Sequence, residues 1–590
     1  MTRPPLANLF AVHDADSLIL DALAADLEQS GEFAETWRPA PGWVAASAPL
    51  PFGEPDAGVV RENRLAFVEG RDLIEGRASG TSREDFQRVA ELADVSPERL
   101  DSLPGDFGFI CFRPHGAATV VRSCGGLVPF YLWQAGQRLA VSTRLGDLVR
   151  YLPDEPRLDP LVNAVWTSGH GFFLDGRTFL AGMSILDRGC FARIQCGRPR
   201  DVGRYWNPRP KRLPRPTPAR VREHADRLRA LLVDKLAHDL DPEGGNLLTL
   251  SGGVDSSALG ALAAGTVGRN VWTWSLLPEP DDLFRHEMSY ITPLANQFRF
   301  EQSWSIRMRA NTRIDLLHTA PPIVFHVIHP ALCDLPRVHR EAPVRVLFGG
   351  EFADEVCGSA LTFPDWANHT SLLGLVAGLG RLPSGPRDVL RWAKHYLLSV
   401  VGQPKHPFPT ELPDFVRPEI QEEYRAWLER RRRDAACDPD PWRYLALRAE
   451  ADGFVAMNWE AASAVGIRRS FPFFNREVLE LAFECHPVEL VGPGTKKLLR
   501  AALRDDVPRR NLERQDKGQW GAYLRDVKRT WDVPLPETLD PLVRSEWYPK
   551  PPRLLDLWEA FIFSEMIIFS HSLSTRRLGR RSLVDSNLRT

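Results

Sequence analysis

A loop of small residues and one carboxylate is the first part of this chain whose residue types suggest chemistry. An apolar run ends in Ser251–Ser257, which reads SGGVDSS, and an Ala- and Leu-rich helical pattern follows. Small residues between a strand and a helix can offer backbone N–H groups to an anion, and the helix dipole favours the same charge. Asp255 would repel bare phosphate, so the loop predicts a divalent cation such as Mg²⁺ between carboxylate and phosphate. A tight structural turn is the alternative interpretation.

Two later segments also contain residue types that could take part in chemistry. Val346–Gly358 reads VLFGGEFADEVCG, so glycines and carboxylates again follow an apolar run. Thr495–Trp520 is rich in Lys and Arg. Taken alone, the first of these could be an acidic helix N-cap, and Lys496 and Arg500 could be surface charges as well as site residues. The SGGVDSS loop lacks the Walker pattern G-x-x-x-x-G-K-[ST], which argues against a kinase or GTPase.

The elements that must position these segments alternate along the second part of the chain. Strands are predicted at 246–250, 271–277 and 344–350, with helices from Asp255 onward and around 288–297. Such alternation is typical of a parallel sheet with helices on its faces. Ligands of these sheets bind beyond the carboxyl ends of the strands, and the SGGVDSS loop follows such an end.

The first 200 residues favour strands instead. Short β-branched and aromatic runs separated by Gly, Pro and Asp predict strands at 64–70, 106–113, 117–123, 129–134 and 138–143. Trp206–Pro218 contains five prolines and predicts a stiff linker. We therefore expect one domain over 1–205, a Pro-rich linker over 206–218 and a second domain over 219–590. Residues 363–441 mix helical patches with proline-rich breaks and are left unassigned.

Composition excludes several classes of protein. The chain has 590 residues, 43% hydrophobic and 25% charged, with a formal net charge of −2, which argues against a nucleic-acid-coating protein. The eight cysteines form no C-x-x-C pair and indicate reduced cytosolic thiols without a zinc site. His326 and His329 lack a third ligand nearby in the sequence. Three acids interrupt the apolar stretch 554–573, so we expect a buried helix, no membrane association and a cytoplasmic protein.

The motifs resemble those of a known enzyme family. The string S-G-G-x-D-S resembles the pyrophosphate-binding loop of ATP-pyrophosphatases, which cut ATP between the α and β phosphates. Val346–Gly358 looks like the S-G-E-G-A-D-E segment of asparagine synthetases, with Glu351, Asp354 and Glu355 matching. The resemblance implies that Asp255 and Asp354 hold Mg²⁺ and that Glu351 lies near the reacting acyl group. It also implies an ATP-binding site that contains Leu250, Ser251, Gly252, Gly253, Asp255, Ser256, Ser257, Gly349 and Gly350.

The remaining motifs extend the resemblance over most of the chain. Thr495–Trp520 is similar to the family's K-x-x-L-R-x-A…R-x-K stretch, which makes Lys517 the match for the catalytic lysine that steadies charge during acyl transfer. Segments 103–112, 121–132 and 139–149 resemble the family's glutaminase domain. The fold class implied is α/β: a degenerate Ntn-glutaminase-like α+β sandwich, then an ATP-pyrophosphatase (adenine nucleotide α-hydrolase-like) domain with a parallel sheet and helices on both faces.

This chain departs from the family pattern at several positions. Glutamine-using members begin Met-Cys-Gly-Ile, whereas this sequence begins Met1-Thr2, and a first strand predicted at Asn8–Val12 puts the Cys position near Ala7. We therefore expect no working glutaminase. Three other departures are Ser123 for Asp, Gly349 for Ser and Phe352 for Gly. Ser470 for Arg and Asn475 for Asp leave the local ionic contacts there in doubt.

An activated carboxyl that meets no ammonia must meet another amine. Relatives without the Cys include β-lactam and carbapenam synthetases and lasso-peptide cyclases, and the chain's length and divergent motifs favour the cyclases. The resemblance then implies a macrolactam synthetase that acts on a precursor core peptide, with a leader-peptide-binding protein and a leader peptidase as pathway partners. Alternatives are an asparagine- or β-lactam-synthetase-like enzyme with a small substrate, and a PP-loop enzyme that adenylates tRNA bases. Arg430–Arg433 and Arg576–Arg581 are expected to be solvated faces.

Overall fold

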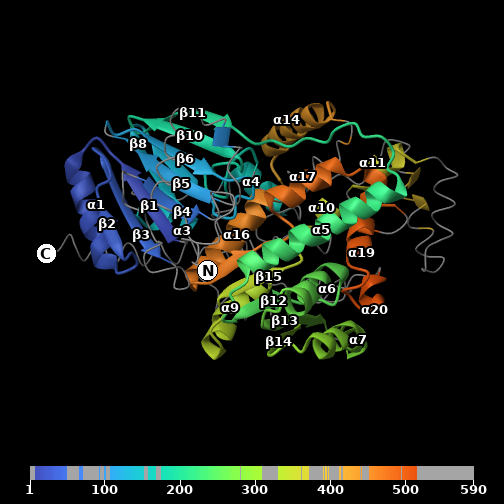
Figure 1. The fold of residues 1–590 in the computed structure, drawn as a ribbon. Coiled ribbons are helices and arrows are strands. Elements are labelled where there is room, and N and C mark those ends of the chain that lie inside the picture. The colour runs from blue at the N-terminus through green and yellow to red at the C-terminus, as the bar shows by residue number, and fades with distance from the viewer. Residues whose placement is uncertain are drawn as a thin grey trace.

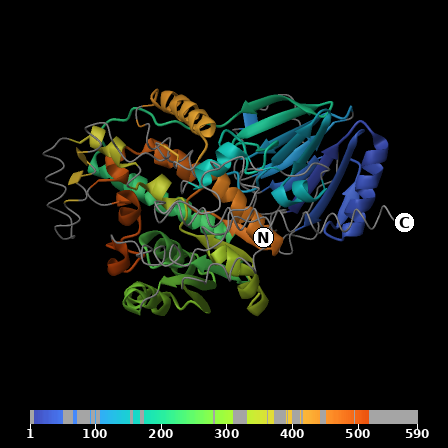
Figure 2. The ribbon, with the colours of Figure 1, turned by 180° about the vertical axis from the view of Figure 1, so that it is seen from behind.

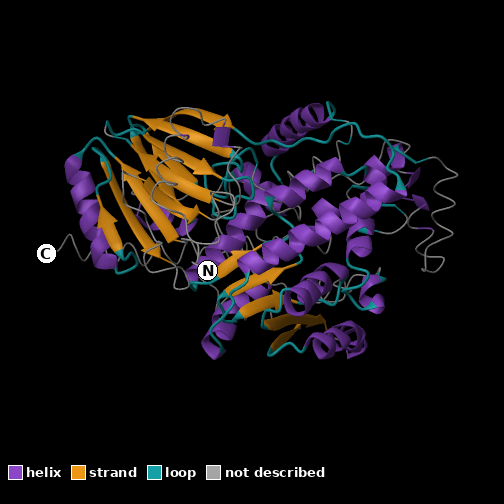
Figure 3. Ribbon diagram, in the orientation of Figure 1, coloured by secondary structure: helices purple, strands orange, loops and turns teal. Residues whose placement is uncertain are grey.

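The architecture is taken from a computed structural model of the chain. It describes residues 7–49, 65–70, 99–100, 107–113, 115–151, 157, 159–167, 174–278, 281–308, 330–359, 362–370, 411–412, 416–438, 440, 451–492 and 495–514, together with 92, 390, 393–394 and 396–397. One group of strands lies at one end of the molecule, and a second group lies among the helices of the other part (Figure 3). Lys517, His326, His329, the stretch 554–573 and Arg576–Arg581 lie outside the described residues.

Two antiparallel sheets make up the described part of the N-terminal half. One has the strand order β2-β3-β1-β8-β7-β9 and the other β11-β10-β6-β5-β4. The first sheet contains β1 (Ala7–His13), β2 (Glu35–Trp37), β3 (Trp43–Pro49), β7 (Tyr131–Ala135), β8 (Arg138–Ser142) and β9 (Met183–Ile185). The second contains β4 (Leu65–Gly70), β5 (Phe107–Phe112), β6 (Ala118–Arg122), β10 (Cys190–Gln195) and β11 (Arg198–Arg204). The five strands predicted in this half are thus confirmed.

Strand β1 shows why this half is layered. Its alternate residues Leu9 and Ala11 are buried against Ile110 of the second sheet, in one hydrophobic core. Phe10 and Val12 point the opposite way, into a second core with residues of α1 (Ser17–Ser30). A strand whose two sets of alternating side chains are both apolar must be covered on both faces. The result is a sheet-on-sheet pair with helices outside it (Figure 1); whether it is a glutaminase-like sandwich stays a prediction.

The second half is built on a parallel sheet, as predicted. Its described strands follow the order β14-β13-β12-β15-β16, and every neighbouring pair is parallel. They are β12 (Asn246–Thr249), β13 (Val271–Pro278), β14 (Ser303–Met308), β15 (Val346–Gly349) and β16 (Arg468–Ser470). The strand at the centre, β12, lies between β13 and β15, so the loops that follow β12 and β15 emerge side by side.

Helices cover both faces of this sheet. Leu248 and Phe348 are buried on one face with residues of α5 (Pro218–Asp239) and α6 (Val254–Ala261). Leu247 and Leu347, one residue earlier in each strand, are buried on the other face with residues of α9 (Pro330–Glu341) and α16 (Ala451–Ala464). Apolar residues at consecutive positions, without alternation, are the pattern of a strand that is buried on both sides. Figure 2 shows the sheet between its helix layers from behind.

The other described helices complete the two halves. They are α3 (Leu145–Tyr151), α4 (Pro160–Thr167), η3 (Leu262–Thr266), α7 (Asp281–Phe298), α10 (Ala353–Cys357), α11 (Phe363–Asn368), α14 (Pro418–Ala435), α17 (Arg476–Glu484), α18 (Pro487–Leu490), α19 (Lys497–Ala502) and α20 (Arg509–Leu512). The arginines 430–433 lie in the last two turns of α14, an otherwise charged helix whose buried residues include Trp427. Within the described part of the chain, no helix has both the length and the apolar character that crossing a membrane requires.

The Pro-rich segment connects the halves without regular structure. After β11, residues 206–217 form neither helix nor strand, and α5 begins at Pro218 with Thr217 as its N-cap. Trp206 Nε1 donates to Glu480 of α17 at 3.0 Å, so the start of this segment is fixed to the second half. The guanidinium of Arg188, from the first half, lies 4.3 Å from the ring centre of Phe474. The halves therefore pack on each other.

A buried pair of acids lies where the halves meet. Glu460 of α16 accepts a hydrogen bond from the backbone N–H of Leu145, at the start of α3. Asp147 of α3 accepts from the Ser142 hydroxyl at 3.2 Å and lies 3.5 Å from Arg144. Burial raises the pKa of Glu460 to about 8 and that of Asp147 to about 6, although Arg144 opposes both shifts.

We predict that Glu460→Gln makes the stability of the protein less dependent on pH. The folded pKa of Glu460 exceeds its ordinary value near 4.5, so the folded state keeps a proton that the unfolded chain has released. The free energy of unfolding should therefore fall as the pH rises from about 5 to about 8. Gln keeps the acceptor for Leu145 and cannot ionise. Urea unfolding at several pH values measures the slope.

The control is Glu422→Gln on the exposed side of α14. It should leave the pH dependence of the wild-type protein unchanged. Equal slopes in all three proteins would show that Glu460 does not titrate at this contact.

Candidate active site

The two small-residue loops touch at the carboxyl edge of the parallel sheet. Thr249 at the end of β12 is in register with Gly349 at the end of β15. A Cβ built on Gly350 would lie 2.6 Å from Asp255 Cβ and 2.9 Å from Ser256 N. Because a real Cβ cannot approach so closely, glycine is required at 350 for the loops to meet. Two predicted site segments, about a hundred residues apart in sequence, are thus brought together.

The SGGVDSS loop is organised by its own serines. Ser256 Oγ accepts from Ser251 N at 3.2 Å and lies 3.2 Å from Ser251 Oγ. Gly252 has φ +69°, a conformation that glycine adopts without strain. Gly253 is the N-cap of α6, so the loop ends at a helix N-terminus. Leu250 is buried beneath it and donates its N–H to Trp274 O at 2.8 Å, which anchors the loop to β13.

Two carboxylates face each other across the loops, with a lysine between them. Lys496 Nζ forms an ion pair with Asp255 and another, at 2.9 Å, with Asp354 Oδ1. Only 4% of the Lys496 side chain is exposed, against 22% for Asp255 and 30% for Asp354. Burial alone would lower the pKa of Lys496, but the two aspartates raise it above its ordinary value. Lys496 is therefore no surface charge.

This arrangement fits a cation site. Two carboxylates from neighbouring loops converge on one positive group, and Mg²⁺ is held by one or two carboxylates together with substrate phosphates. Asp255 and Asp354 are the residues that would hold Mg²⁺, and the open Ser251 and Gly253 lie beside them for phosphate. Bound Mg²⁺ would neutralise phosphate charge at this edge of the sheet.

The predicted catalytic residue Glu351 lies on the other side of the β15 loop. Its Oε1 forms an ion pair with Arg469 Nη2 at 2.7 Å. Arg469, in β16, is 2% exposed in its side chain, and its Nε donates to Asn458 Oδ1 at 2.8 Å. Burial lowers the pKa of the Arg469 guanidinium, and Glu351 opposes that shift. Glu351 thus pairs with Arg469, and its carboxylate lies over Gly349, where it would meet an added Cβ.

Sequence reasoning missed two side chains that contact the SGGVDSS loop, Arg514 and Asn511. Arg514 donates to Ser251 O at 3.2 Å and pairs with the buried Glu287 at 2.6 Å. Its guanidinium also lies 4.2 Å from the ring centre of Tyr290 in α7. Asn511 Nδ2 lies within hydrogen-bonding distance of Gly252 O, 3.1 Å, and of Ser257 Oγ, 3.2 Å. Arg514 lies three residues before Lys517, within the family-like segment Thr495–Trp520. The sequence therefore located Arg514 but could not predict its contacts.

Of the two predicted basic residues Arg500 and Lys517, only Arg500 lies in the described part of the chain. Arg500 Nε donates to Thr495 O at 2.9 Å and Nη2 to Arg514 O at 2.8 Å, so Arg500 fixes the backbone around α19 and α20. Burial lowers the pKa of its guanidinium. Lys517 lies outside the described residues, and its role stays a prediction.

The departures from the family motifs have local explanations. Phe352 has φ +66°, which disfavours side chains with a Cβ, yet its ring stacks on Phe474 with centroids 4.1 Å apart. Arg468, two residues before Ser470, pairs with Asp239 at 3.1 Å, and the Ser470 hydroxyl donates to the same carboxylate. Asn475 Oδ1 accepts from Val478 N at 2.9 Å and so caps α17. Ser470 and Asn475 thus both make side-chain hydrogen bonds at the positions where the family pattern has Arg and Asp.

Comparison with protein families decides the membership of the chain. The family model described as asparagine synthase matches residues 227–566, more than half of the 590 residues. The chain belongs to the asparagine synthase family. The matched range contains the SGGVDSS loop, Glu351, Asp354, Lys496 and Lys517. Membership of the asparagine synthase family supports an ATP-dependent, amide-bond-forming carbon–nitrogen ligase at the level of the family.

Comparisons with individual proteins add little to this family assignment. No curated protein sequence matches the chain significantly. Among solved structures, the chain is similar to NMN synthetase from Francisella tularensis, with 19% sequence identity and a TM-score of 0.18. That match covers 23% of this chain and 57% of the other, so the chain spans less than two thirds of that structure.

We predict that Lys496→Met destabilises the protein and that Mg²⁺ reverses the loss. Without the ammonium, Asp255 and Asp354 repel each other, and breaking a buried pair by removing one partner costs about 3 kcal/mol. A divalent cation can replace the missing charge, whereas in the wild-type protein it must compete with Lys496. Urea unfolding with and without Mg²⁺ measures both effects.

Lys497→Met is the matched control, because Lys497 Nζ donates to Val488 O at 2.6 Å and pairs with neither aspartate. Mg²⁺ should stabilise this variant no more than the wild-type protein. A Lys496→Met protein that gained nothing extra from Mg²⁺ would contradict the assignment of a cation site to Asp255 and Asp354.

Proposed function

We propose that the chain is an ATP- and Mg²⁺-dependent macrolactam synthetase of the lasso-peptide cyclase type. It activates a side-chain carboxylate of a precursor core peptide and joins it to the peptide's N-terminal amine. The observation that supports ATP activation is that the SGGVDSS loop meets Asp354 at one edge of the sheet. There Asp255 and Asp354 both form ion pairs with the Lys496 ammonium. Family membership supports the amide-forming part.

The first step is carboxyl activation. A carboxylate oxygen of the substrate attacks the α-phosphorus of ATP, and the bond from that phosphorus to the bridging oxygen of the β-phosphate breaks. Pyrophosphate leaves, and the N-terminus of α6 with the open residues of the loop can hold its charge. Lys517 is the residue that we assign to charge stabilisation during acyl transfer.

The second step is amide formation. The amine nitrogen attacks the acyl carbon, AMP leaves with the former carboxylate oxygen, and the nitrogen loses a proton. Glu351 is the carboxylate beside the site that can accept this proton, and its ion pair with Arg469 fixes its position. Holding amine and acyl adenylate together makes the step intramolecular, which can lower the barrier by several kcal/mol.

Support for an amine other than ammonia comes from the N-terminal half. Strand β1 begins at Ala7, and alanine offers no nucleophile at the position where the resemblance places the glutaminase cysteine. Arg122, from the family's R-D pair, donates to Leu186 O and to Gly126 O, each at 2.7 Å, so it braces a loop. A leader-peptide-binding protein and a leader peptidase remain the proposed pathway partners.

We predict that the purified protein, given ATP and Mg²⁺, removes one water from a leaderless core peptide that carries an acidic side chain. Mass spectrometry detects the dehydrated product, and a pyrophosphate assay follows the activation step. Asp255→Asn should release at least about a hundred-fold less pyrophosphate, because it removes one carboxylate of the cation site.

Asp226→Asn, on the exposed side of α5, is the matched control and should retain full pyrophosphate release. Asparagine made from aspartate and ammonia, without any dehydrated peptide, would refute the macrolactam proposal and leave the ligase class standing. Undiminished pyrophosphate release by Asp255→Asn would refute the site assignment itself.

A further inference from the structure

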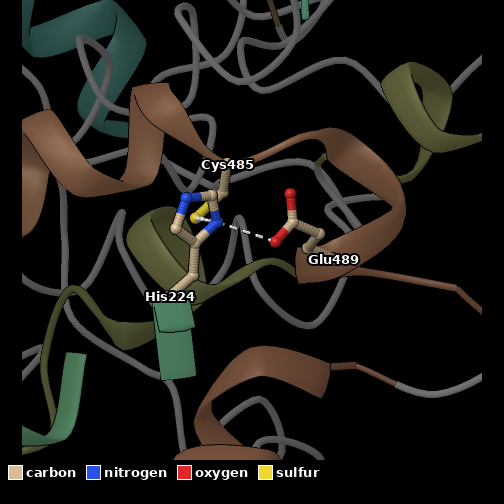
Figure 4. Close-up of side chains that lie close together, drawn as sticks. All are labelled: His224, Cys485 and Glu489. Carbon is tan, nitrogen blue, oxygen red and sulfur yellow. Dashed lines mark hydrogen bonds and ion pairs between the residues drawn. The ribbon is translucent and has the colours of Figure 1, made fainter. Parts of the chain in front are cut away.

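A second cluster of metal-binding side chains lies away from the two aspartates. His224 of α5, Cys485 at the C-cap of α17 and Glu489 of α18 point toward one another (Figure 4). Their ligand atoms all lie within 4.8 Å of one another. The three residues are 5%, 0% and 3% exposed. We propose that they bind a zinc ion.

The donor atoms suit zinc better than magnesium or calcium. Imidazole nitrogen, thiolate sulfur and carboxylate oxygen are all ordinary zinc ligands, whereas the harder cations prefer oxygen alone. Thiolate together with imidazole is a combination that favours zinc among the common cellular metals. Among the described residues, this is the cluster of at least three His, Cys, Asp or Glu side chains that could share one ion.

Two of the three separations between donors are close to those of a tetrahedral site, and the third, from Cys485 Sγ to the Glu489 carboxylate, is within 4.8 Å. Cys485 Sγ and His224 Nδ1 are 3.5 Å apart, and His224 Nδ1 and Glu489 Oε2 are 2.8 Å apart. Zinc–ligand bonds of ordinary length put a sulfur and a nitrogen about 3.6 Å apart and a nitrogen and an oxygen about 3.3 Å apart. The first pair needs no movement. The second must open by about half an ångström as its hydrogen bond is replaced by two bonds to zinc.

The carboxylate is already oriented for this role. Glu489 Oε1 accepts from His486 N at 2.8 Å, as part of a capping box at the start of α18. That bond leaves Oε2 as the oxygen directed at His224. Outer hydrogen bonds of this kind fix the orientation of metal-binding carboxylates.

Charge and protons balance when zinc enters. The Cys485 thiol releases its proton, and the Nδ1 proton that His224 shares with Glu489 moves to Nε2 of the same ring, so that a neutral imidazole and a carboxylate each turn a lone pair toward the ion. A thiolate and a carboxylate then carry two negative charges against the two positive charges of zinc. A neutral buried site results, with a water molecule as the fourth ligand.

The cluster is connected through the backbone to the segment that carries Lys496. Glu489 is followed by Leu490, whose carbonyl packs against Gly358 just after α10, where a built Cβ would lie 2.9 Å from that oxygen. Gly358 O in turn accepts from Lys496 N at 3.2 Å. Zinc at this cluster would therefore fix the segment that carries Lys496 to α5. This role does not depend on which substrate the enzyme takes.

The proposal is tested on the full-length protein by adding one equivalent of ZnCl₂ or CoCl₂ and desalting. Elemental analysis should find one zinc ion per chain retained by the wild-type protein. The Co²⁺ form should show a thiolate-to-metal charge-transfer band, which carboxylate ligands such as Asp255 and Asp354 cannot produce. The melting temperature should rise on addition of zinc.

Cys485→Ala should lose the retained zinc, the charge-transfer band and the stabilisation. Cys357→Ala is the matched control, because Cys357 is equally buried, at 1% exposed, and lies outside the cluster. It should keep all three. A wild-type protein that retains no zinc, or whose Co²⁺ form lacks the thiolate band, would overturn the proposal even if Cys485→Ala failed to fold.

Discussion

The ion triad of Lys496, Asp255 and Asp354 is the constraint on which the rest of the site depends. Its two acids follow neighbouring strands, β12 and β15, while its base comes from the start of α19, 241 residues after Asp255. Lys496 is almost fully buried, so the cost of removing its charge from water must be offset by both carboxylates. The Lys496 ammonium is therefore stable only where the two loops bring both carboxylates together. The loops meet only because Gly350 has no side chain.

The framework of the site was readable from the sequence, because local rules determine it. Apolar runs that are buried on both faces predicted β12, β13 and β15, and the small residues after them predicted loops at the carboxyl edge of the sheet. Asp255, Asp354 and Glu351 could be chosen from short motifs. For Lys496 the sequence left a site residue and a surface charge as open alternatives, since its partners lie far away in sequence. Arg469 and Arg514 escaped notice because their contacts are also made with residues distant in sequence.

The His224, Cys485 and Glu489 cluster shows the same limit more sharply. A search for closely spaced cysteines and histidines finds nothing here, because the imidazole comes from α5 and its partners come from α17 and α18. Cys485 and Glu489 lie on either side of the break between α17 and α18, a spacing that indicates no metal site until α5 packs against it. Metal-binding patterns that are assembled by tertiary packing alone leave no local signature.

The substitutions in the family motifs also show how a site can keep its geometry while its sequence diverges. Phe352 occupies a left-handed conformation that disfavours it, and its stack on Phe474 with edge contacts to Phe454 and Phe471 offsets that cost. Asp239 pairs with Arg468 and accepts a hydrogen bond from the Ser470 hydroxyl. Asn475 caps α17 through its side-chain oxygen. Each departure from the family pattern is thus matched by a local contact of the residue present or of its neighbour. The backbone around Asp354 and β16 therefore does not depend on the residue types that the pattern has at these positions.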